Sequence, residues 1–296
     1  MKVFFLTFLA ITMMAAPVLQ DVRGKITAGD LAGAAAYAED FRKVNGENAE
    51  YVEALSWLAR GAFSFKNYKG AEQYSTQART IVDTLLKKEK LEGNPKLISA
   101  LGASIEVHSK LLNMQGKKKQ AVSELEAELE RTSWLPLKIR IQKNINLIGM
   151  EGQPAPEMDE LAKFKGKPML LFLWAHWCGD CKAQAPSLAR IAAKYKDRGL
   201  AVIAPTRRYG YTEKKSENAT VEEEDAEIAR IWKEVYTGLV DVPVVTSEAI
   251  MVRYGASTTP TFVLIDKKGT VRLYHPGRLA ESELEQRIEK MLQASK

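Results

Sequence analysis

The only two cysteines of the chain are Cys178 and Cys181, which are separated by Gly179 and Asp180. Two thiols at this spacing can form a disulfide with each other and exchange it with another disulfide. The apolar run 170–175 before them predicts a buried strand that leads into a helix. Cys178 would then lie at the helix N-terminus, where free N–H groups and the helix dipole stabilise a thiolate. Cys181, one turn later, could attack a mixed disulfide formed on Cys178.

A Cys-x-x-Cys pair also occurs in zinc sites and haem attachment motifs, so the surrounding residues matter. Zinc would need a second pair of ligands, but His108, His176 and His275 show no ligand spacing. Haem attachment would need a histidine at the position of Lys182. We therefore expect no metal and no cofactor. A static disulfide, or two small buried side chains, is the alternative without chemistry.

Two longer motifs give the cysteines a context. The first, Trp174-Ala-x-Trp177-Cys178-Gly179-x-Cys181-Lys182, resembles the active-site strand, turn and helix of thioredoxin-fold proteins. The second, Thr258-Thr259-Pro260-Thr261-Phe262, resembles the cis-proline loop and following strand of the same family. The gap between them is wider than in a minimal thioredoxin. In this it resembles the TlpA/ResA-like branch, which has an inserted helix and strand, here at about 206–246.

The resemblance implies a protein-disulfide oxidoreductase whose substrates are proteins with disulfides. Cys178 would attack the partner's disulfide, and Cys181 would resolve the mixed disulfide. A cis bond before Pro260 and an extended Thr259 would offer backbone groups to a substrate strand. Trp177 would shield the sulfurs from water.

Gly179 and Asp180 complete the predicted site as residues that shape the turn. Two positions depart from the family pattern. Phe172 stands where thioredoxins have a buried acid, and Gln184 stands where the ResA-like branch has Glu. Asp180 could take the proton of the resolving cysteine through water, or be a polar turn residue. His176 is either a titratable group near the thiolate or a surface residue at a strand end.

Other activities of this fold match the sequence less well. A peroxiredoxin has Thr or Ser three residues before its reactive cysteine, where this chain has Ala175, and a Sco-type copper chaperone has three residues between its cysteines. We expect a reductant kept reduced by a membrane thiol donor, because the helix N-terminus and Lys182 favour the thiolate while Asp180 opposes it. The alternative is an interaction protein with a redox-silent thioredoxin fold.

Length and composition predict two domains, since 296 residues with 46% hydrophobic content can form two cores. Residues 1–20 have one basic residue followed by an apolar run, which predicts a signal peptide or an uncleaved anchor. The chain would then be periplasmic or otherwise extracytoplasmic, either secreted or membrane-anchored. The net charge of +6 is spread among 37 acidic residues, so we expect no nucleic-acid partner.

Residues 21–148 predict an all-α domain built from helical hairpins. Ala, Leu and aromatic residues recur at helical spacing, and the breaks fit six helices between about Thr27 and Gly149. The segment 55–78 resembles a degenerate tetratricopeptide helix pair, so this domain could bind a protein partner. Residues 149–157 are rich in Gly and Pro and predict a linker.

Residues 158–296 predict an α/β thioredoxin-like fold, a mixed sheet with helices on both faces. Within its insertion, Arg207, Arg208, Tyr209 and Tyr211 follow the carboxyl end of a predicted strand, where α/β sheets place ligands. This segment is either a solvated loop or a rim that docks the partner.

Overall fold

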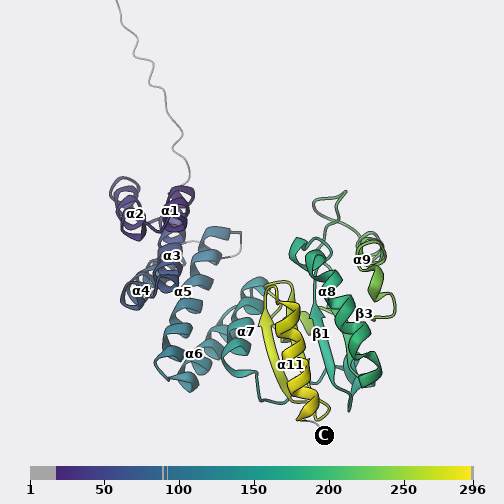
Figure 1. Ribbon diagram of the computed structural model, residues 1–296. Coiled ribbons are helices and arrows are strands. Elements are labelled where there is room, and N and C mark those ends of the chain that lie inside the picture. Colours follow the sequence, from purple (N-terminus) through teal and green to yellow (C-terminus); the bar gives the residue numbers. More distant parts are fainter. Residues whose placement is uncertain (1–17, 89, 92, 295–296) are drawn as a thin grey trace, which may run out of the picture. The chain divides into compact units, whose positions relative to one another are not determined.

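The computed structural model describes residues 18–88, 90–91 and 93–294 (Figure 1). The chain forms two compact units, residues 1–111 and 112–296. Among the described residues, no helix has the length and apolar character needed to span a membrane. Of the predicted signal or anchor segment, positions 1–17 lie outside the described residues.

All the secondary-structure elements in the described part of the first unit are helices. Its helices are α1 (Val18–Thr27), α2 (Leu31–Asn45), α3 (Ala49–Ser64), α4 (Tyr68–Leu85) and α5 (Pro95–Met114), whose last residues enter the second unit. Polar breaks in the sequence become helix caps. The Asn48 side chain accepts from the N–H groups of Glu50 and Tyr51, and Asn67 accepts from Gly70. The helices α2–α7 match the six predicted ones.

Helix α1 was not predicted, because the apolar segment before it dominated the interpretation of the N-terminus. Val18 and Val22 are buried and lie one helical turn apart, and α1 packs on α2 and α3. The helical region therefore begins earlier than the sequence pattern indicated.

The second unit joins two helices to an α/β domain. Its elements are α6 (Lys118–Arg131), α7 (Leu135–Gly149), η1 (Asp159–Phe164), β1 (Met169–Leu173), α8 (Gly179–Tyr195), η2 (Lys196–Arg198), β2 (Ala201–Thr206), α9 (Val221–Val235), η3 (Thr237–Leu239), β3 (Val244–Thr246), α10 (Glu248–Arg253), β4 (Thr261–Ile265), β5 (Val271–Pro276) and α11 (Glu281–Gln293). The insertion predicted at about 206–246 contains α9 and β3.

The five strands form one mixed sheet in the order β3-β2-β1-β4-β5. Strand β1 pairs with β2 in parallel and with β4 in antiparallel orientation, so it is central. Its side chains alternate between two apolar cores. Leu170 and Phe172 face the core that contains α8 and α11 residues, whereas Leu171 and Leu173 face the core that contains α10 residues. Burial on both faces explains the continuous apolar run before the cysteines.

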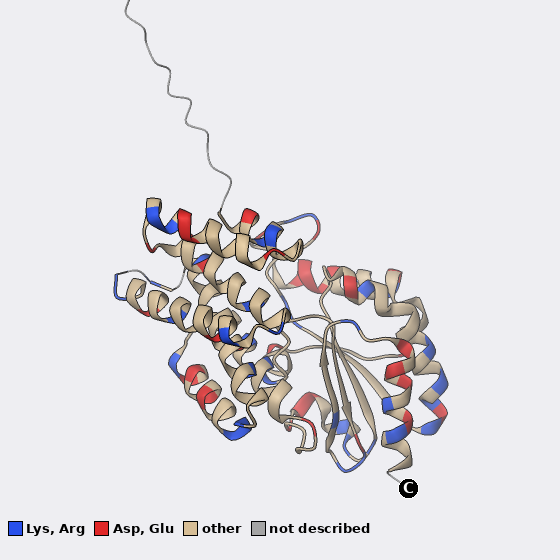
Figure 2. Cartoon of the chain, turned by 60° about the vertical axis from the view of Figure 1, so that its left-hand side comes forward, with Lys and Arg blue, Asp and Glu red and all other residues tan. Residues whose placement is uncertain are grey.

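Three ion pairs connect α8 and the following η2 to α11 along their exposed sides. Arg190 pairs with Glu281 at 2.5 Å, Lys194 pairs with Glu285 at 2.8 Å, and Arg198 pairs with Glu289. Figure 2 shows the resulting alternation of acidic and basic residues on the helices near the C-terminus. Exposed pairs of this kind contribute little stability each, so their effect is mainly to align the two helices.

Helix α7 packs against the α/β domain at α10 and β5. The Asn146 side chain donates to the Arg253 carbonyl at 3.3 Å. A Cβ added to Gly255, which has φ +61°, would come 2.3 Å from the Lys143 backbone nitrogen. The compact units therefore divide within α5, and the segment 149–157 that was predicted as a linker lies inside the second unit.

We expect Gly255→Ala to lower the free energy of unfolding by about 3 kcal/mol or more, because it combines a left-handed backbone with a clash against α7. Gly199→Ala is the matched control, since Gly199 has φ +82° and open space around it. That control should lose only about 1 kcal/mol. Urea unfolding measures both. Equal losses in the two variants would mean that the α7 contact contributes nothing.

Candidate active site

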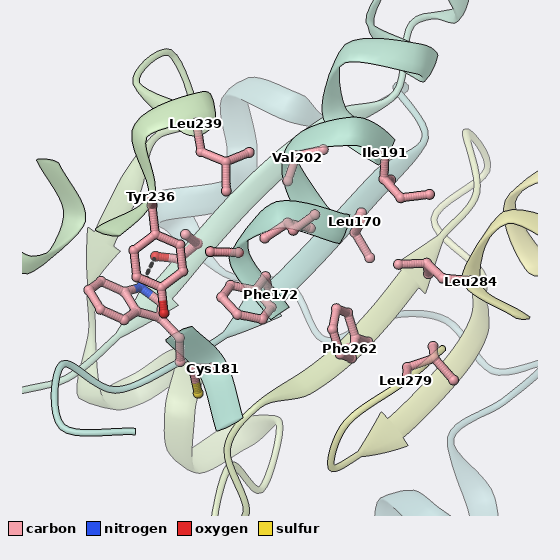
Figure 3. Close-up of a cluster of buried hydrophobic side chains, with 14 of the residues drawn as sticks. Leu170, Phe172, Cys181, Ile191, Val202, Tyr236, Leu239, Phe262, Leu279 and Leu284 are labelled. Carbon is pink, nitrogen blue, oxygen red and sulfur yellow. Dashed lines mark hydrogen bonds between the residues drawn. The ribbon is translucent and has the colours of Figure 1, made fainter. Parts of the chain in front are cut away.

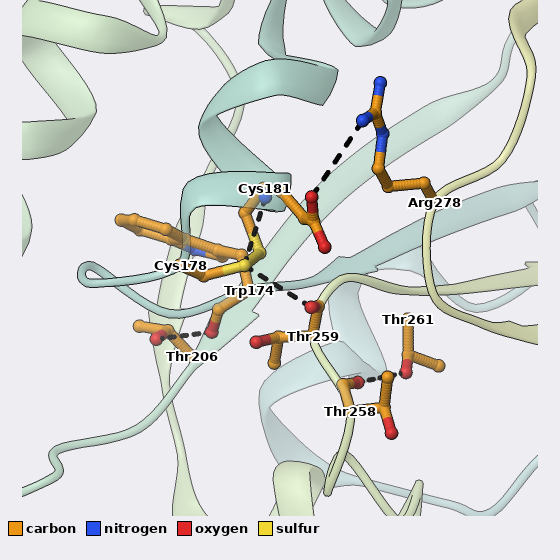
Figure 4. Close-up of a disulfide and its surroundings, with 9 residues drawn as sticks. Trp174, Cys178, Cys181, Thr206, Thr258, Thr259, Thr261 and Arg278 are labelled. Carbon is orange, nitrogen blue, oxygen red and sulfur yellow. Dashed lines mark hydrogen bonds and ion pairs between the residues drawn. A yellow bond between two sulfur atoms is a disulfide. The ribbon is translucent and has the colours of Figure 1, made fainter. Parts of the chain in front are cut away.

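The redox site begins where β1 leaves the sheet. The Trp174 carbonyl accepts a hydrogen bond from the buried Thr206 hydroxyl at 2.8 Å, and the Trp174 indole donates to the Ala204 carbonyl at 3.3 Å (Figure 4). Both partners come from β2. These bonds fix the end of the strand, so the following turn to α8 starts from a rigid position.

Cys178 and Cys181 form a disulfide at the start of α8. Cys178 is the N-cap residue, and its sulfur accepts a hydrogen bond from the Cys181 backbone N–H at 3.0 Å. An unpaired helix N–H that points at sulfur would stabilise a thiolate there. Cys178 is 3% exposed and Cys181 is fully buried, so Cys178 is the more accessible of the two sulfurs.

The loop before β4 lies against the same sulfur. The Thr259 carbonyl oxygen is 3.4 Å from Cys178 Sγ, and the Thr259–Pro260 peptide bond is cis (Figure 4). The Thr261 hydroxyl donates to the Thr258 carbonyl at 2.6 Å, and the Gly277 N–H donates to the Pro260 carbonyl at 2.7 Å. The two predicted motifs, 81 residues apart at Cys178 and Thr259, therefore meet at one point.

The exposed residues around the disulfide carry aromatic and charged groups. Trp177 is 45% exposed and contacts the edge of the Tyr209 ring, with centroids 5.4 Å apart. The Arg207 guanidinium lies 4.5 Å from the centre of that ring. The Asp180 side chain is 64% exposed and lies 4.0 Å from Arg278. Asp180 is thus a solvated residue with a cationic neighbour, which favours its interpretation as a polar turn residue.

A model of the Redoxin family matches residues 152–290, which include both cysteines and Pro260. This part of the chain is a Redoxin domain. It has the thioredoxin fold and is similar to the TlpA/ResA-like thiol–disulfide oxidoreductases. Among its described residues, no cluster of His, Cys, Asp and Glu could hold a metal ion.

Curated relatives and solved structures resemble the same region. The thioredoxin-like protein YneN of Bacillus subtilis (strain 168) is 26% identical over 167 residues, 53% of this chain and 89% of YneN. The thiol-disulfide oxidoreductase ResA of Bacillus thuringiensis subsp. konkukian (strain 97-27) is 29% identical over 132 residues, 45% of this chain and 68% of ResA. The exposed lipoprotein thioredoxin of Streptococcus pneumoniae strain TIGR4 is 26% identical, with a TM-score of 0.35, and the match covers 44% of this chain and 89% of that one.

Two positions of the Redoxin domain carry uncharged side chains where the family resemblance led us to expect an acidic residue. Phe172 is fully buried between the rings of Phe262 and Tyr236, with centroid distances of 5.4 Å and 6.2 Å (Figure 3). Gln184 is buried, and its amide oxygen accepts from the Leu279 N–H at 2.7 Å. Both positions are therefore occupied by packing or backbone-binding side chains.

His176 is buried, so the prediction that it is a surface residue at the strand end is wrong. Its side chain is 2% exposed because the insertion covers it, with the Tyr209 and Tyr211 rings 5.9 Å and 5.5 Å away. Its Nδ1 lies 3.8 Å from Oε1 of Glu224. Burial lowers the pKa of His176, and Glu224 partly offsets this effect. Glu224 was missed because only the folded insertion brings it to the redox turn.

We expect Gln184→Leu to lower the free energy of unfolding by about 1–3 kcal/mol, because the buried Leu279 N–H would lose its acceptor. Gln184→Glu keeps an oxygen that can accept from Leu279 and, in its protonated form, should lose less, because no charge is then buried. Urea unfolding in mild acid compares the two variants, since at neutral pH the buried carboxylate would add its own desolvation cost. If Gln184→Leu proves as stable as the wild type, the amide is not needed to hold the 277–280 segment.

Proposed function

We propose that this chain is an extracytoplasmic reductant of disulfides in partner proteins. The observation that carries the proposal is the position of Cys178. Its sulfur lies at the N-cap of α8, accepts the Cys181 N–H, and touches the loop that contains the cis Thr259–Pro260 bond. A thiolate at this place is stabilised by the helix and lies beside backbone groups that can bind an extended substrate strand.

The reaction uses two electrons and no cofactor. The Cys178 thiolate attacks one sulfur of the partner's disulfide, and the other sulfur leaves as a thiolate that takes up a proton. The Cys181 thiol then loses its proton and attacks the Cys178 sulfur, which releases the second partner thiol. The partner is reduced, and the Cys178–Cys181 disulfide seen in the structure is the oxidised product.

The residues around the sulfurs would position the partner rather than transfer electrons. Thr259 and Pro260 supply the backbone edge, and Trp177 supplies an exposed aromatic surface in contact with Tyr209. Gly179, the first residue of α8, has open space around its Cα. A side chain there would face the approaching partner, so glycine keeps the sulfur accessible.

The helical region would select the partner, and the N-terminal segment would set the location. The tetratricopeptide-like spacing in residues 55–78 supports a protein-binding role for the first unit. The apolar segment in residues 1–20 supports export, with or without retention as an anchor. A membrane thiol donor outside the cytoplasm would return the disulfide to the dithiol.

Trapping tests the reaction and the assigned roles. Cys181→Ser should accumulate mixed disulfides with partner proteins in its host, because the resolving thiol is missing, whereas Cys178→Ser should form none. Insulin reduction with dithiothreitol should require both cysteines. Wild-type protein that is folded but does not accelerate insulin reduction would favour the alternative, a redox-silent interaction protein.

The direction of electron flow is tested by the reduction potential. The α8 N-terminus favours the Cys178 thiolate and Asp180 opposes it, so we expect a potential of about −200 to −280 mV. Equilibration of the pair with glutathione, followed by separation of the reduced and oxidised proteins, measures this value. A potential above about −150 mV would instead identify an oxidant.

A further inference from the structure

The Redoxin domain contains a buried acid–base pair that the reaction described above does not use. His176 and Glu224 are 2% and 1% exposed, and Nδ1 of His176 lies 3.8 Å from Oε1 of Glu224. Neither ring nitrogen of His176 makes a well-formed hydrogen bond, although the Tyr211 backbone lies near enough to favour the protonated ring. A buried imidazole that is so weakly satisfied is costly.

Glu224 connects this pair to the insertion. Its carboxylate accepts hydrogen bonds from the backbone N–H groups of Tyr209 and Gly210, the latter at 2.8 Å. The ring of Tyr209 in turn contacts both His176 and Trp177. The carboxylate is therefore held in place by backbone donors, and its charge is fixed beside the turn that carries Cys178.

Charged groups face His176 from two helices, and a tyrosine faces it from a loop. Glu224 and Glu227 on α9 favour the protonated imidazole, while Lys182 on α8 disfavours it, and Tyr211 lies beside the ring on the loop. Lys182 is itself 3.7 Å from Glu213. Burial is the largest effect and lowers the pKa of His176. The lowered pKa of His176 favours its neutral form, so the charge of the pair is then that of the Glu224 carboxylate alone, and uptake of one proton by His176 cancels it.

The histidine of this pair is close to the nucleophile along the chain. His176 is two residues before Cys178, so the chain limits the distance between their Cα atoms to roughly 7 Å. Solvent and salt screen a buried charge only weakly at such a distance. A negative pair opposes ionisation of the Cys178 thiol, and a neutral pair does not.

We propose that His176 and Glu224 form a proton-operated pair that sets the reactivity of Cys178. When His176 is neutral, the Glu224 charge restrains the thiolate. When His176 takes up a proton in acid, the restraint is removed and the imidazolium and thiolate stabilise each other. Both are positioning residues, because neither takes part in bond formation, and the proposal rests on the proposed function of Cys178 as nucleophile.

The coupling predicts the pH dependence of the thiolate. In a site with one ionisation, the thiolate population falls tenfold for each pH unit below its midpoint. In this protein, His176 takes up a proton in the same pH range, and this favours the Cys178 thiolate. The thiolate population should therefore fall less than tenfold for each pH unit. One charge at roughly 10 Å in a partly buried site changes the thiolate population by about three- to tenfold.

The experiment measures the rate at which iodoacetamide alkylates Cys178 in the reduced protein from pH 4.5 to 8.5, with the modified peptide quantified by mass spectrometry. At pH 5, the wild type should react about three- to fivefold faster than His176→Gln, and at pH 8 the two should be equal. Glu224→Gln should react about threefold faster than the wild type at pH 6. His108→Gln, which alters a histidine of α5, is the control and should match the wild type.

Three outcomes would overturn the proposal. These are a His176→Gln profile that superimposes on the wild type, a Glu224→Gln rate no higher than the wild type at pH 6, or a wild-type profile that follows a single ionisation. The last outcome is measured on the wild-type protein alone. The test therefore still gives a result if one of the variants fails to fold. Alkylation uses no protein substrate. A protein that shows the coupled profile but fails to reduce insulin would refute the proposed function and leave this proposal standing.

Discussion

The site depends on one junction, where a strand buried on both faces gives way to a helix whose first residues carry the cysteines. Cys178 caps α8, and the Cys181 N–H points at its sulfur. A helix N-terminus has N–H groups without partners, and here sulfur satisfies one of them. The Thr206 bond to Trp174 holds the strand side of the junction, and the ion pairs of α8 and η2 with α11 align the helix side.

The interior beneath this junction is kept free of charge. Phe172 packs among aromatic rings and Gln184 binds a backbone N–H, so no carboxylate lies at the two positions where the family resemblance led us to expect one. Desolvation makes an isolated buried carboxylate costly, and Glu224 is tolerated because two backbone donors bind it. The buried carboxylate nearest the redox turn is therefore Glu224, which comes from the insertion and lies beside His176.

The last helix before the glycine- and proline-rich segment packs on the Redoxin domain. Helix α7 lies against α10 and β5, and the Gly255 backbone approaches the α7 backbone so closely that no Cβ fits. Gly255 is five residues before Pro260, so the helix supports the chain that leads into the cis-proline loop. The last two helices before the sheet thus belong to the scaffold of the site.

The sequence determined the local elements and the chemistry of this protein. The cysteine spacing and the apolar run before it predicted the strand and the helix start, because these features depend on short-range pattern. The meeting of the Thr259-Pro260 loop with the sulfur, 81 residues away in the chain, was implied only by the resemblance to thioredoxin-fold proteins. The helical spacing of apolar residues and the polar, Gly and Pro breaks between them likewise predicted helices α2–α7. Only the tertiary structure decided which residues from distant segments lie at the redox site. It buried His176 under the insertion beside Glu224, joined α7 to the sheet, and paired Asp180 with Arg278. Such contacts join residues far apart in the chain, and their energies depend on burial and distance, which a single sequence does not contain.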